Sequence, residues 1–154
     1  MKTTKINEEV LFATDAIVKI DASDIAELKQ KAKQNPRRRI RICVHSDIRD
    51  SIHEMLIVHS FGQYIQPHIN LVSAKSFVVL DGEMVVVLFN NEGEISNYVQ
   101  LGESNGASAF LLRLDDPVFH TVVPISTTVT FLETVKGPHV QTHIHHLLHW
   151  QGHC

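Results

Sequence analysis

The sequence predicts a mainly β domain, folded as a sandwich or a barrel. After residue 36, short runs rich in Val, Ile, Thr and Phe alternate with turn residues, which is typical of all-β domains. Asp81-Gly82 and the Asn-Asn-Glu-Gly cluster at 90–93 are turns of the kind that connect antiparallel strands. A chain of 154 residues, 44% of them hydrophobic, can bury one hydrophobic core, so we expect one domain.

One helical pattern precedes the strands. Apolar residues recur at helical spacing in SDIAELKQKAKQ (23–34), and either Asp21 or Ser23 can cap the start of the helix. The apolar positions are Ile25, Leu28 and Ala32. Asn35-Pro36 ends the pattern, because the residue before a proline avoids the helical region. The sequence therefore predicts a single short helix before the β domain.

Eight strand candidates follow the helix. Each is a short run of β-branched and other apolar residues bounded by turn residues. Their bounds are 38–44, 53–59, 76–80, 83–90, 95–101, 108–113, 119–123 and 127–135. No internal repeat or low-complexity linker divides them. We expect an N-terminal segment (1–35) whose helix packs on a barrel (36–138), followed by a C-terminal tail (139–154).

Composition and charge exclude several classes of partner. With 20% charged residues and a net charge of −3, the chain has no electrostatic basis for binding nucleic acid or an anionic membrane. The longest apolar run, 84–89, is too short to span a bilayer, and the first ten residues lack the apolar core of a signal peptide. Cys43 and Cys154 form no motif, so we expect a reduced, cytoplasmic protein with Cys43 in the core.

The stretch 62–82 has the most informative spacing. Gly62, His68, Asn70, Lys75 and Gly82 are spaced as in the first cupin motif, G-x5-H-x-H-x(3,4)-E-x6-G. Asn70 stands in place of the second His, and Lys75 in place of the Glu. The resemblance implies a cupin double-stranded β-helix, a jelly-roll barrel whose inward-facing His and Glu side chains hold a divalent metal. The two replacements predict weak metal binding or none.

The resemblance extends over residues 20–138. The runs PRRRIRICVH, HEMLIV, PHIN, SFVVLDGEMVVVLF and PVFHTVVP resemble the WbuC family of cupin-fold metalloproteins, which is found among bacterial surface-polysaccharide (O-antigen) genes. Of the two His and one Glu in that family's pattern P-H-x-H-x-x-K-x-E-S-F, this chain keeps only the first His, His68. His120, in the stretch similar to the second cupin motif, is also kept. The resemblance implies that any Zn, Fe, Mn or Ni ion is held by His68 and His120.

Lys75 leaves two interpretations open. A buried lysine needs a partner, so in a decayed metal site Lys75 would pair with an acid such as Glu54 or extend to the barrel mouth. Alternatively, residues 75–82 resemble part of the metal-free dTDP-sugar 3,5-epimerases. That resemblance implies His68 as the catalytic base and Lys75 as the group that stabilises an enolate oxyanion.

Two further clusters are candidates for ligand binding. Arg37, Arg39 and Arg41 alternate along one strand face, where they could bind a phosphate, a carboxylate or a nucleotide-sugar diphosphate, or form a salt-bridged strand edge. His53 and Glu54 are neighbours, so only one of them can face the barrel interior.

The tail is rich in histidine. Six of the eleven histidines fall there: His139, His143, His145, His146, His149 and His153. Such a tract could capture Zn, Cu or Ni loosely, because imidazole suits these ions. Leu147, Leu148 and Trp150 indicate that part of the tail packs onto the barrel.

These observations predict a barrel that binds or transforms a small polar, sugar-related ligand in surface-polysaccharide biosynthesis, a nucleotide sugar being one candidate. The expected ligand-binding residues are Asn70, Arg39, Arg41 and His53. Three alternatives stay open: a metal-free epimerase or isomerase using His68 and Lys75, a divalent-metal cupin using His68 and His120, and a non-catalytic structural or interaction cupin. Cupins are often dimers, so we expect a homodimer.

Overall fold

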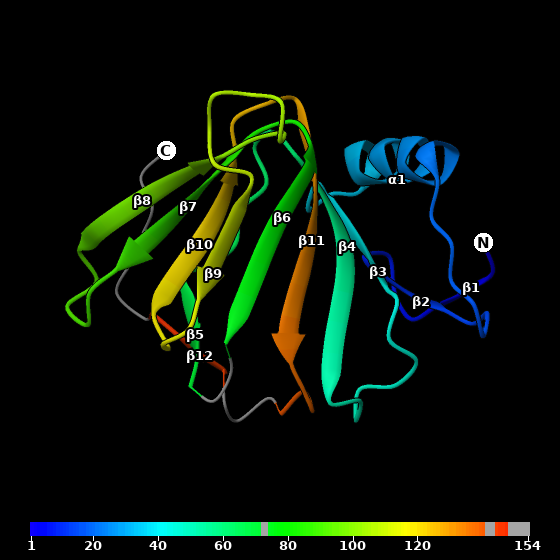
Figure 1. The fold of residues 1–154 in the computed structure, drawn as a ribbon, viewed down its shortest axis with the longest axis horizontal. Helices are drawn as coiled ribbons and strands as arrows, with labels where there is room; N and C mark the ends of the chain where they lie inside the picture. Colours follow the sequence, from blue (N-terminus) through cyan, green and yellow to red (C-terminus); the bar gives the residue numbers. More distant parts are fainter. Residues whose placement is uncertain (72–73, 141–143, 148–154) are drawn as a thin grey trace.

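The computed structural model describes residues 1–71, 74–140 and 144–147, which form two facing β-sheets and one helix (Figure 1). The helix, α1, spans Ala22–Gln34. The strands are β1 (Thr3–Lys5), β2 (Val10–Ala13), β3 (Arg39–Cys43), β4 (Ile52–Ser60), β5 (His68–Asn70), β6 (Lys75–Asp81), β7 (Met84–Phe89), β8 (Ile95–Leu101), β9 (Leu111–Leu114), β10 (Phe119–Pro124), β11 (Thr128–Lys136) and β12 (Ile144–His146). The predicted mainly β fold is confirmed. Within the described ranges, no helix is long and apolar enough to cross a membrane.

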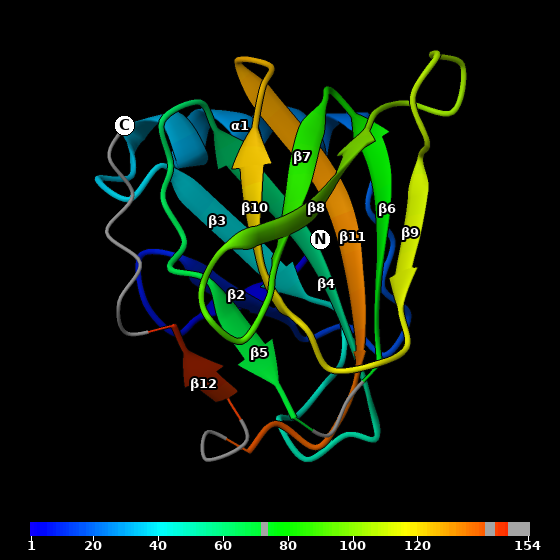
Figure 2. The same cartoon turned by 90° about the vertical axis from the view of Figure 1, so that its left-hand side faces the viewer.

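The two sheets enclose the interior of a barrel (Figure 2). One sheet has the order β1-β2-β3-β4-β11-β6-β9, and the other has the order β12-β5-β10-β7-β8. The hairpin between β6 and β7 turns at Gly82, whose φ of +81° and close approach to the Thr128 carbonyl leave no room for a side chain. This turn carries the chain from one sheet to the other, directly after the strand that begins with Lys75.

All eight predicted strands occur, with small shifts at their ends, the largest at β9, which begins at Leu111 rather than at 108. The described structure also has strands β1, β2, β5 and β12, which the strand prediction did not include because they are only three or four residues long. The expected N-terminal segment therefore contributes more than a helix, since β2 pairs in parallel with β3. The segment boundaries at 35 and 138 remain predictions.

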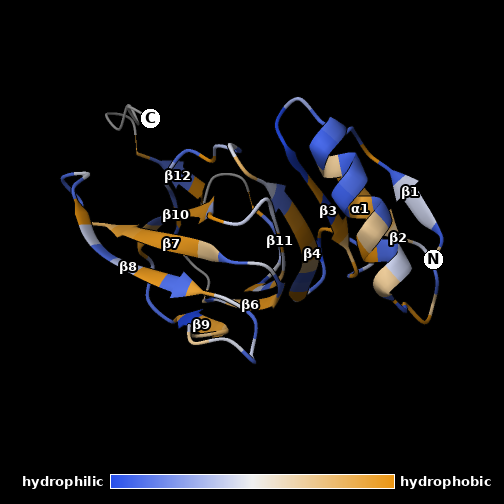
Figure 3. Cartoon of the chain, turned by 90° about the horizontal axis from the view of Figure 1, so that it is seen from above, coloured by the Kyte–Doolittle hydropathy of each residue, from blue (hydrophilic) through white to orange (hydrophobic). Residues whose placement is uncertain are grey.

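The helix begins and ends where the sequence indicates. The Asp21 carboxylate accepts hydrogen bonds from the backbone N–H groups of Ser23 and Asp24, and the Asp24 carboxylate accepts one from Asp21 N–H, which completes a capping box. Asn35 leaves the helical region, as expected before a proline. Leu28 and Ala32 are buried in a cluster with residues of β3 and β4, on the outer face of the sheet (Figure 3).

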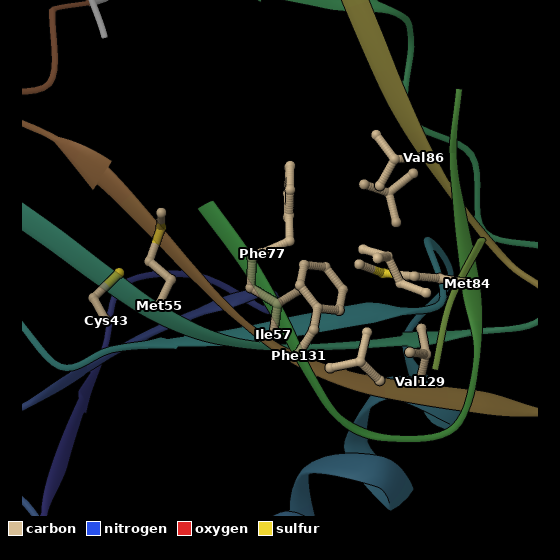
Figure 4. Close-up of a cluster of buried hydrophobic side chains, with 11 residues drawn as sticks. Cys43, Met55, Ile57, Phe77, Met84, Val86, Val129 and Phe131 are labelled. Atoms are coloured by element: carbon tan, nitrogen blue, oxygen red, sulfur yellow. The ribbon is translucent and has the colours of Figure 1, made fainter. Parts of the chain in front are cut away.

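Strands β3 and β4 are covered on both faces. Leu56 and Val58 pack toward the helix, whereas Met55 and Ile57 belong to the barrel core with Phe131 (Figure 4). Since side chains alternate along a strand, the odd-numbered residues of β3 and β4 face the barrel. This alternation aims the polar residues of both strands inward: Arg39, Arg41, His53 and His59.

Candidate ligand-binding site

A polar cavity of about 370 Å³ occupies part of the barrel interior. Its polar walls come from strands that are far apart in the sequence. They comprise Asn7 and Glu9 before β2, Arg39 and Arg41 of β3, His59 of β4, His68 of β5, Lys75 of β6, His120 of β10 and Glu133 of β11. The sheets therefore bring together His68 and Lys75 of the first cupin-like motif and His120 of the second cupin-like stretch.

Lys75 lies at the centre of this group. Its side chain is only 9% exposed, and its ammonium group donates a hydrogen bond to Nε2 of His120 at 3.3 Å. The ammonium also lies 3.4 Å from Oε1 of Glu133 and 5.7 Å from the centroid of the Phe77 ring. A carboxylate, an imidazole lone pair and an aromatic face thus replace the water that a charged lysine loses on burial.

The partner of Lys75 is Glu133, not Glu54. Glu54 is exposed on the opposite face of β4, so the expected pairing with it is wrong. Glu133 was missed because its strand carries no motif. Its signal is alternation, because the positions Val129, Phe131 and Glu133 of β11 share the inward face.

His68 and His120 are neutral and present lone pairs at the cavity. Their strands pair so that the two residues are opposite one another, and their ring centroids are 4.7 Å apart. Nδ1 of His68 donates to the Gln66 carbonyl at 3.2 Å, and Nδ1 of His120 donates to the Val118 carbonyl at 2.9 Å. Since a carbonyl only accepts, Nδ1 carries the proton of each ring and Nε2 is left as an acceptor.

Burial and the nearby ammonium keep both rings uncharged. Burial, and then the charge of Lys75, lower the pKa of His68 from its ordinary 6.5 to about 4. The same two causes, in the same order, hold the pKa of His120 well below its ordinary value. At neutral pH neither imidazole therefore adds to the positive charge that Lys75, Arg39 and Arg41 bring to the cavity.

The resemblance to the first cupin motif implies a divalent metal, but these residues do not fit one. Nε2 of His120 already accepts a hydrogen bond from Lys75, and an ion bound to it would be repelled by the ammonium. In the part of the chain that the structure describes, no group of three or more His, Cys, Asp or Glu side chains is arranged to hold a metal. The ammonium of Lys75 stands where a metal-binding relative would have a ligand for its ion.

His59 is a site residue that the sequence analysis missed. It is 3% exposed, its ring lies edge-to-face with Phe131 at 5.2 Å, and its Nδ1 has no hydrogen-bond partner among the described residues. Burial, and then the charge of Arg39, lower the pKa of His59 to about 3. The sequence could have indicated it, because His59 alternates with His53, Met55 and Ile57 along β4 and so shares their inward face.

The arginines of the PRRRIR run differ in their partners. Arg39 pairs with Glu9, Nε to Oε2 at 2.8 Å, and the exposed Arg37 approaches the same carboxylate at 3.2 Å. Arg41 lines the cavity, and no carboxylate of the described residues lies within ion-pair distance of it. The salt-bridged edge therefore describes Arg37 and Arg39. Arg41 is more exposed, and its side chain hydrogen-bonds the Cys43 thiol instead of a carboxylate.

His53 and Asn70 line a second cavity, of about 320 Å³, rather than the first. His53 is the inward-facing residue of the His53–Glu54 pair and is 4% exposed. The two cavities are adjacent, because Arg41, Lys75 and Glu133, among others, line both.

Part of the tail belongs to the barrel. Strand β12 pairs with β5, which places His146 opposite His68, with 6.2 Å between the ring centroids. His139 lies near His53, at 6.5 Å between centroids. His145 lies in β12, and Leu147 is buried. Six tail residues singled out in the sequence lie outside the described residues: His143, Leu148, His149, Trp150, His153 and Cys154. Loose metal capture by the tail stays a prediction.

The depressed histidine pKa values predict a pH dependence of stability. Between the unfolded pKa of 6.5 and folded values of about 4 for His68 and about 3 for His59, the unfolded chain binds more protons than the folded one. We therefore expect stability to be full above pH 6.5 and to fall as the pH drops below it, with each histidine contributing on the order of 2 kcal/mol. Urea denaturation at several pH values measures this, and NMR titration of the imidazoles assigns it. A His59 ring that titrates near 6.5 would contradict its buried, neutral state.

The Lys75–Glu133 pair predicts a non-additive mutant pair. Lys75→Met leaves the Glu133 carboxylate in the barrel without its cation, so the free energy of unfolding should fall by about 3 kcal/mol. Adding Glu133→Gln to Lys75→Met should recover most of that loss, since no unpaired charge remains. Urea denaturation of the two single variants and the double variant tests the coupling. Additive losses would show that the two side chains do not interact.

Comparisons with known proteins agree with this architecture. A family model described as "Domain of unknown function (DUF6016)" matches residues 20–101, more than half of the chain. No curated protein matches. Among solved structures, TT1209 from Thermus thermophilus is 21% identical with a TM-score of 0.54, over 73% of this chain and 93% of that one. Oxalate oxidase in complex with the substrate analogue glycolate is 10% identical with a TM-score of 0.55, over 73% of this chain and 57% of that one.

A further solved structure, CapF with the inhibitor 3-isopropenyl-tropolone, is 14% identical with a TM-score of 0.54, over 64% of this chain and 29% of that one. The chain thus spans little more than half of oxalate oxidase and less than a third of CapF. At these identities the likeness shows the fold, which is the predicted cupin jelly-roll barrel. The chain belongs to the family described as "Domain of unknown function (DUF6016)" and has the fold of the cupin superfamily.

Proposed function

We propose that the barrel binds a small anionic sugar derivative without a metal, and that Lys75 and Arg41 hold the anionic group. The observation that carries this proposal is the ammonium of Lys75 at the wall of an internal cavity. A lysine is rarely buried unless its charge is used or paired, and here the charge borders space that a ligand can enter. The volume of about 370 Å³ lies within the range of small-molecule sites.

The balance of charge in the cavity supports an anionic ligand. Arg39, Arg41 and Lys75 stand against Glu9 and Glu133, so three cations face two carboxylates and one positive charge is left over. Arg39 is neutralised by Glu9 and Lys75 faces Glu133, which leaves the excess at Arg41. A guanidinium matches a carboxylate or a phosphate through parallel hydrogen bonds.

The histidines support the sugar part of the proposal. Nε2 of His68 is an acceptor in a neutral ring, and it is offered to the cavity beside two cationic donors. Acceptors and donors side by side suit hydroxyl groups, which both donate and accept. Oxalate oxidase, a neighbour in fold, is described with glycolate, which likewise combines a hydroxyl with a carboxylate.

The proposed biological role of the ligand rests on the sequence. The WbuC-like runs, with His68 and His120 at motif positions, support a place in the assembly of bacterial surface polysaccharide, where anionic sugars are the building blocks. The homodimer and the cytoplasmic location expected from the sequence remain part of the proposal.

Proton transfer is the second candidate function. His68, with its free Nε2, and the ammonium of Lys75 lie in one cavity, as a base and an oxyanion-stabilising group must. With a pKa of about 4, however, His68 is a weak base. This low basicity favours a role in ligand binding over a role in proton transfer. Exchange of a sugar α-proton in deuterium oxide that disappears in His68→Ala would establish the enzyme.

The binding proposal predicts a selective loss in Arg41→Ala. We expect wild-type protein to bind D-glucuronate and α-D-glucose 1-phosphate but not neutral D-glucose, by isothermal calorimetry or NMR titration. Arg41→Ala should weaken binding of both anions by about tenfold or more, because a hydrogen bond to a charged group contributes roughly 1.5–3 kcal/mol.

Arg113→Ala is the matched control. Arg113 is an exposed β9 residue paired with Asp115 and lines neither cavity, so its removal should leave binding unchanged. Equal affinity for glucose and for the anions, or no effect of Arg41→Ala, would overturn the proposed function.

A further inference from the structure

We propose that the second cavity is a subsite for a flat, uncharged group of the same ligand, joined to the sugar through the anionic group. This inference rests on the proposed function and adds a second half to the ligand. A sugar linked by phosphate to a nucleobase has the required chemistry.

The distribution of charge between the two cavities indicates where the sugar, the anionic group and the flat group of the ligand would lie. The wall shared by both cavities is formed by Asn7, Val10, Arg41, His68, Lys75 and Glu133, and its charged members are Arg41, Lys75 and Glu133. Among the described residues, no other Lys, Arg, Asp or Glu lines the second cavity. An anionic group held at this wall therefore has the polar first cavity on one side and a cavity without further charge on the other.

The walls of the second cavity suit an apolar group. Apart from the charged residues and the histidines, most of its lining is apolar, including Phe12, Ile48, Met55, Val135 and Ile144. With a volume of about 320 Å³, it can hold a ring the size of a nucleobase. Transfer of such a ring from water into these walls is favourable because it buries apolar surface.

Stacked imidazoles form a further part of the wall. The rings of His45 and His53 are stacked at 4.1 Å with 14° between their planes, and His139 follows at 6.5 Å and 25°. Phe12 meets His45 edge-on at 5.4 Å. Stacked rings do not point their nitrogens at a common centre, so they do not form a metal site, but they present flat faces on which another ring can stack.

Both ends of the described chain build this cavity. Ile6 and Phe12 come from the region of β1 and β2, and His139 and Ile144 come from the segment after β11. These segments fold over the barrel beside the site and enclose space there instead of filling it. Because His139 is exposed, it can be replaced without disturbing the core.

Three probes separate the two subsites. α-D-Glucose 1-phosphate carries the sugar and the anion, uridine 5′-monophosphate carries the anion and the base, and UDP-glucose carries all three. We expect UDP-glucose to bind about tenfold tighter than glucose 1-phosphate, which corresponds to about 1.4 kcal/mol. In NMR spectra, uridine 5′-monophosphate should shift resonances of Ile48 and His139, and glucose 1-phosphate those of His59 and His120.

His139→Ala is the decisive variant. It should weaken the binding of UDP-glucose and of uridine 5′-monophosphate by about tenfold, since it removes stacking surface only. The affinity for glucose 1-phosphate should stay unchanged. His145→Ala is the matched control, because His145 is an exposed tail histidine that lines neither cavity. Ile48 is 57% exposed and lines the same cavity. Ile48→Ser should therefore weaken the same two probes as His139→Ala, which would show that the effect is not peculiar to one substitution.

The outcomes distinguish this inference from the function on which it rests. If glucose 1-phosphate binds and UDP-glucose binds no tighter, or if His139→Ala weakens all three probes equally, the second subsite is wrong and the proposed function stands. If neither glucose 1-phosphate nor UDP-glucose binds, the proposed function fails and the subsite fails with it.

Discussion

The placement of one ammonium group inside the barrel governs the chemistry of this protein. Lys75 begins β6 on the inward face, and its charge is balanced by Glu133 and by the lone pair of His120. The same charge helps to hold His68 and His120 neutral, so the histidines act as acceptors. The barrel thus carries a cation built into its own chain, and this cation is the basis of the proposal that the site binds its ligand without a metal.

The double-faced sheet makes this arrangement possible. Because α1 covers the outer face of β3 and β4, both strands can be buried on one side and still direct Arg39, Arg41 and His59 into the barrel on the other. The charged residues gather where the two cavities meet, and the aliphatic core fills the rest of the interior. Both faces of these strands therefore contribute to the hydrophobic core, and the inward face also carries the polar residues of the proposed site.

Much of the barrel could be predicted from local signals, and less of the site. The capping box at Asp21 and the turn at Gly82 depend on neighbouring residues, and the two cupin-like stretches supplied His68, Lys75 and His120 as candidates. Alternation indicates the inward face of Glu133 and His59, but both residues were missed because only strand pairing across long sequence separations brings them beside Lys75 and His68. The second cavity was missed for a related reason, since its walls include β2 and the segment around β12, which are too short to show a periodic pattern.

The most direct test of the account is a residue-resolved measurement of the imidazole nitrogens by ¹⁵N NMR at neutral pH, before and after one equivalent of Zn²⁺. Resolution by residue matters because the histidines of the tail can bind zinc on their own. The account predicts that His68 and His120 are neutral, carry their proton on Nδ1, and keep their Nε2 resonances unchanged when zinc is added, because the charge of Lys75 repels the ion. A shift of both Nε2 resonances at one equivalent would show that the barrel binds the metal, and would contradict the central role of Lys75.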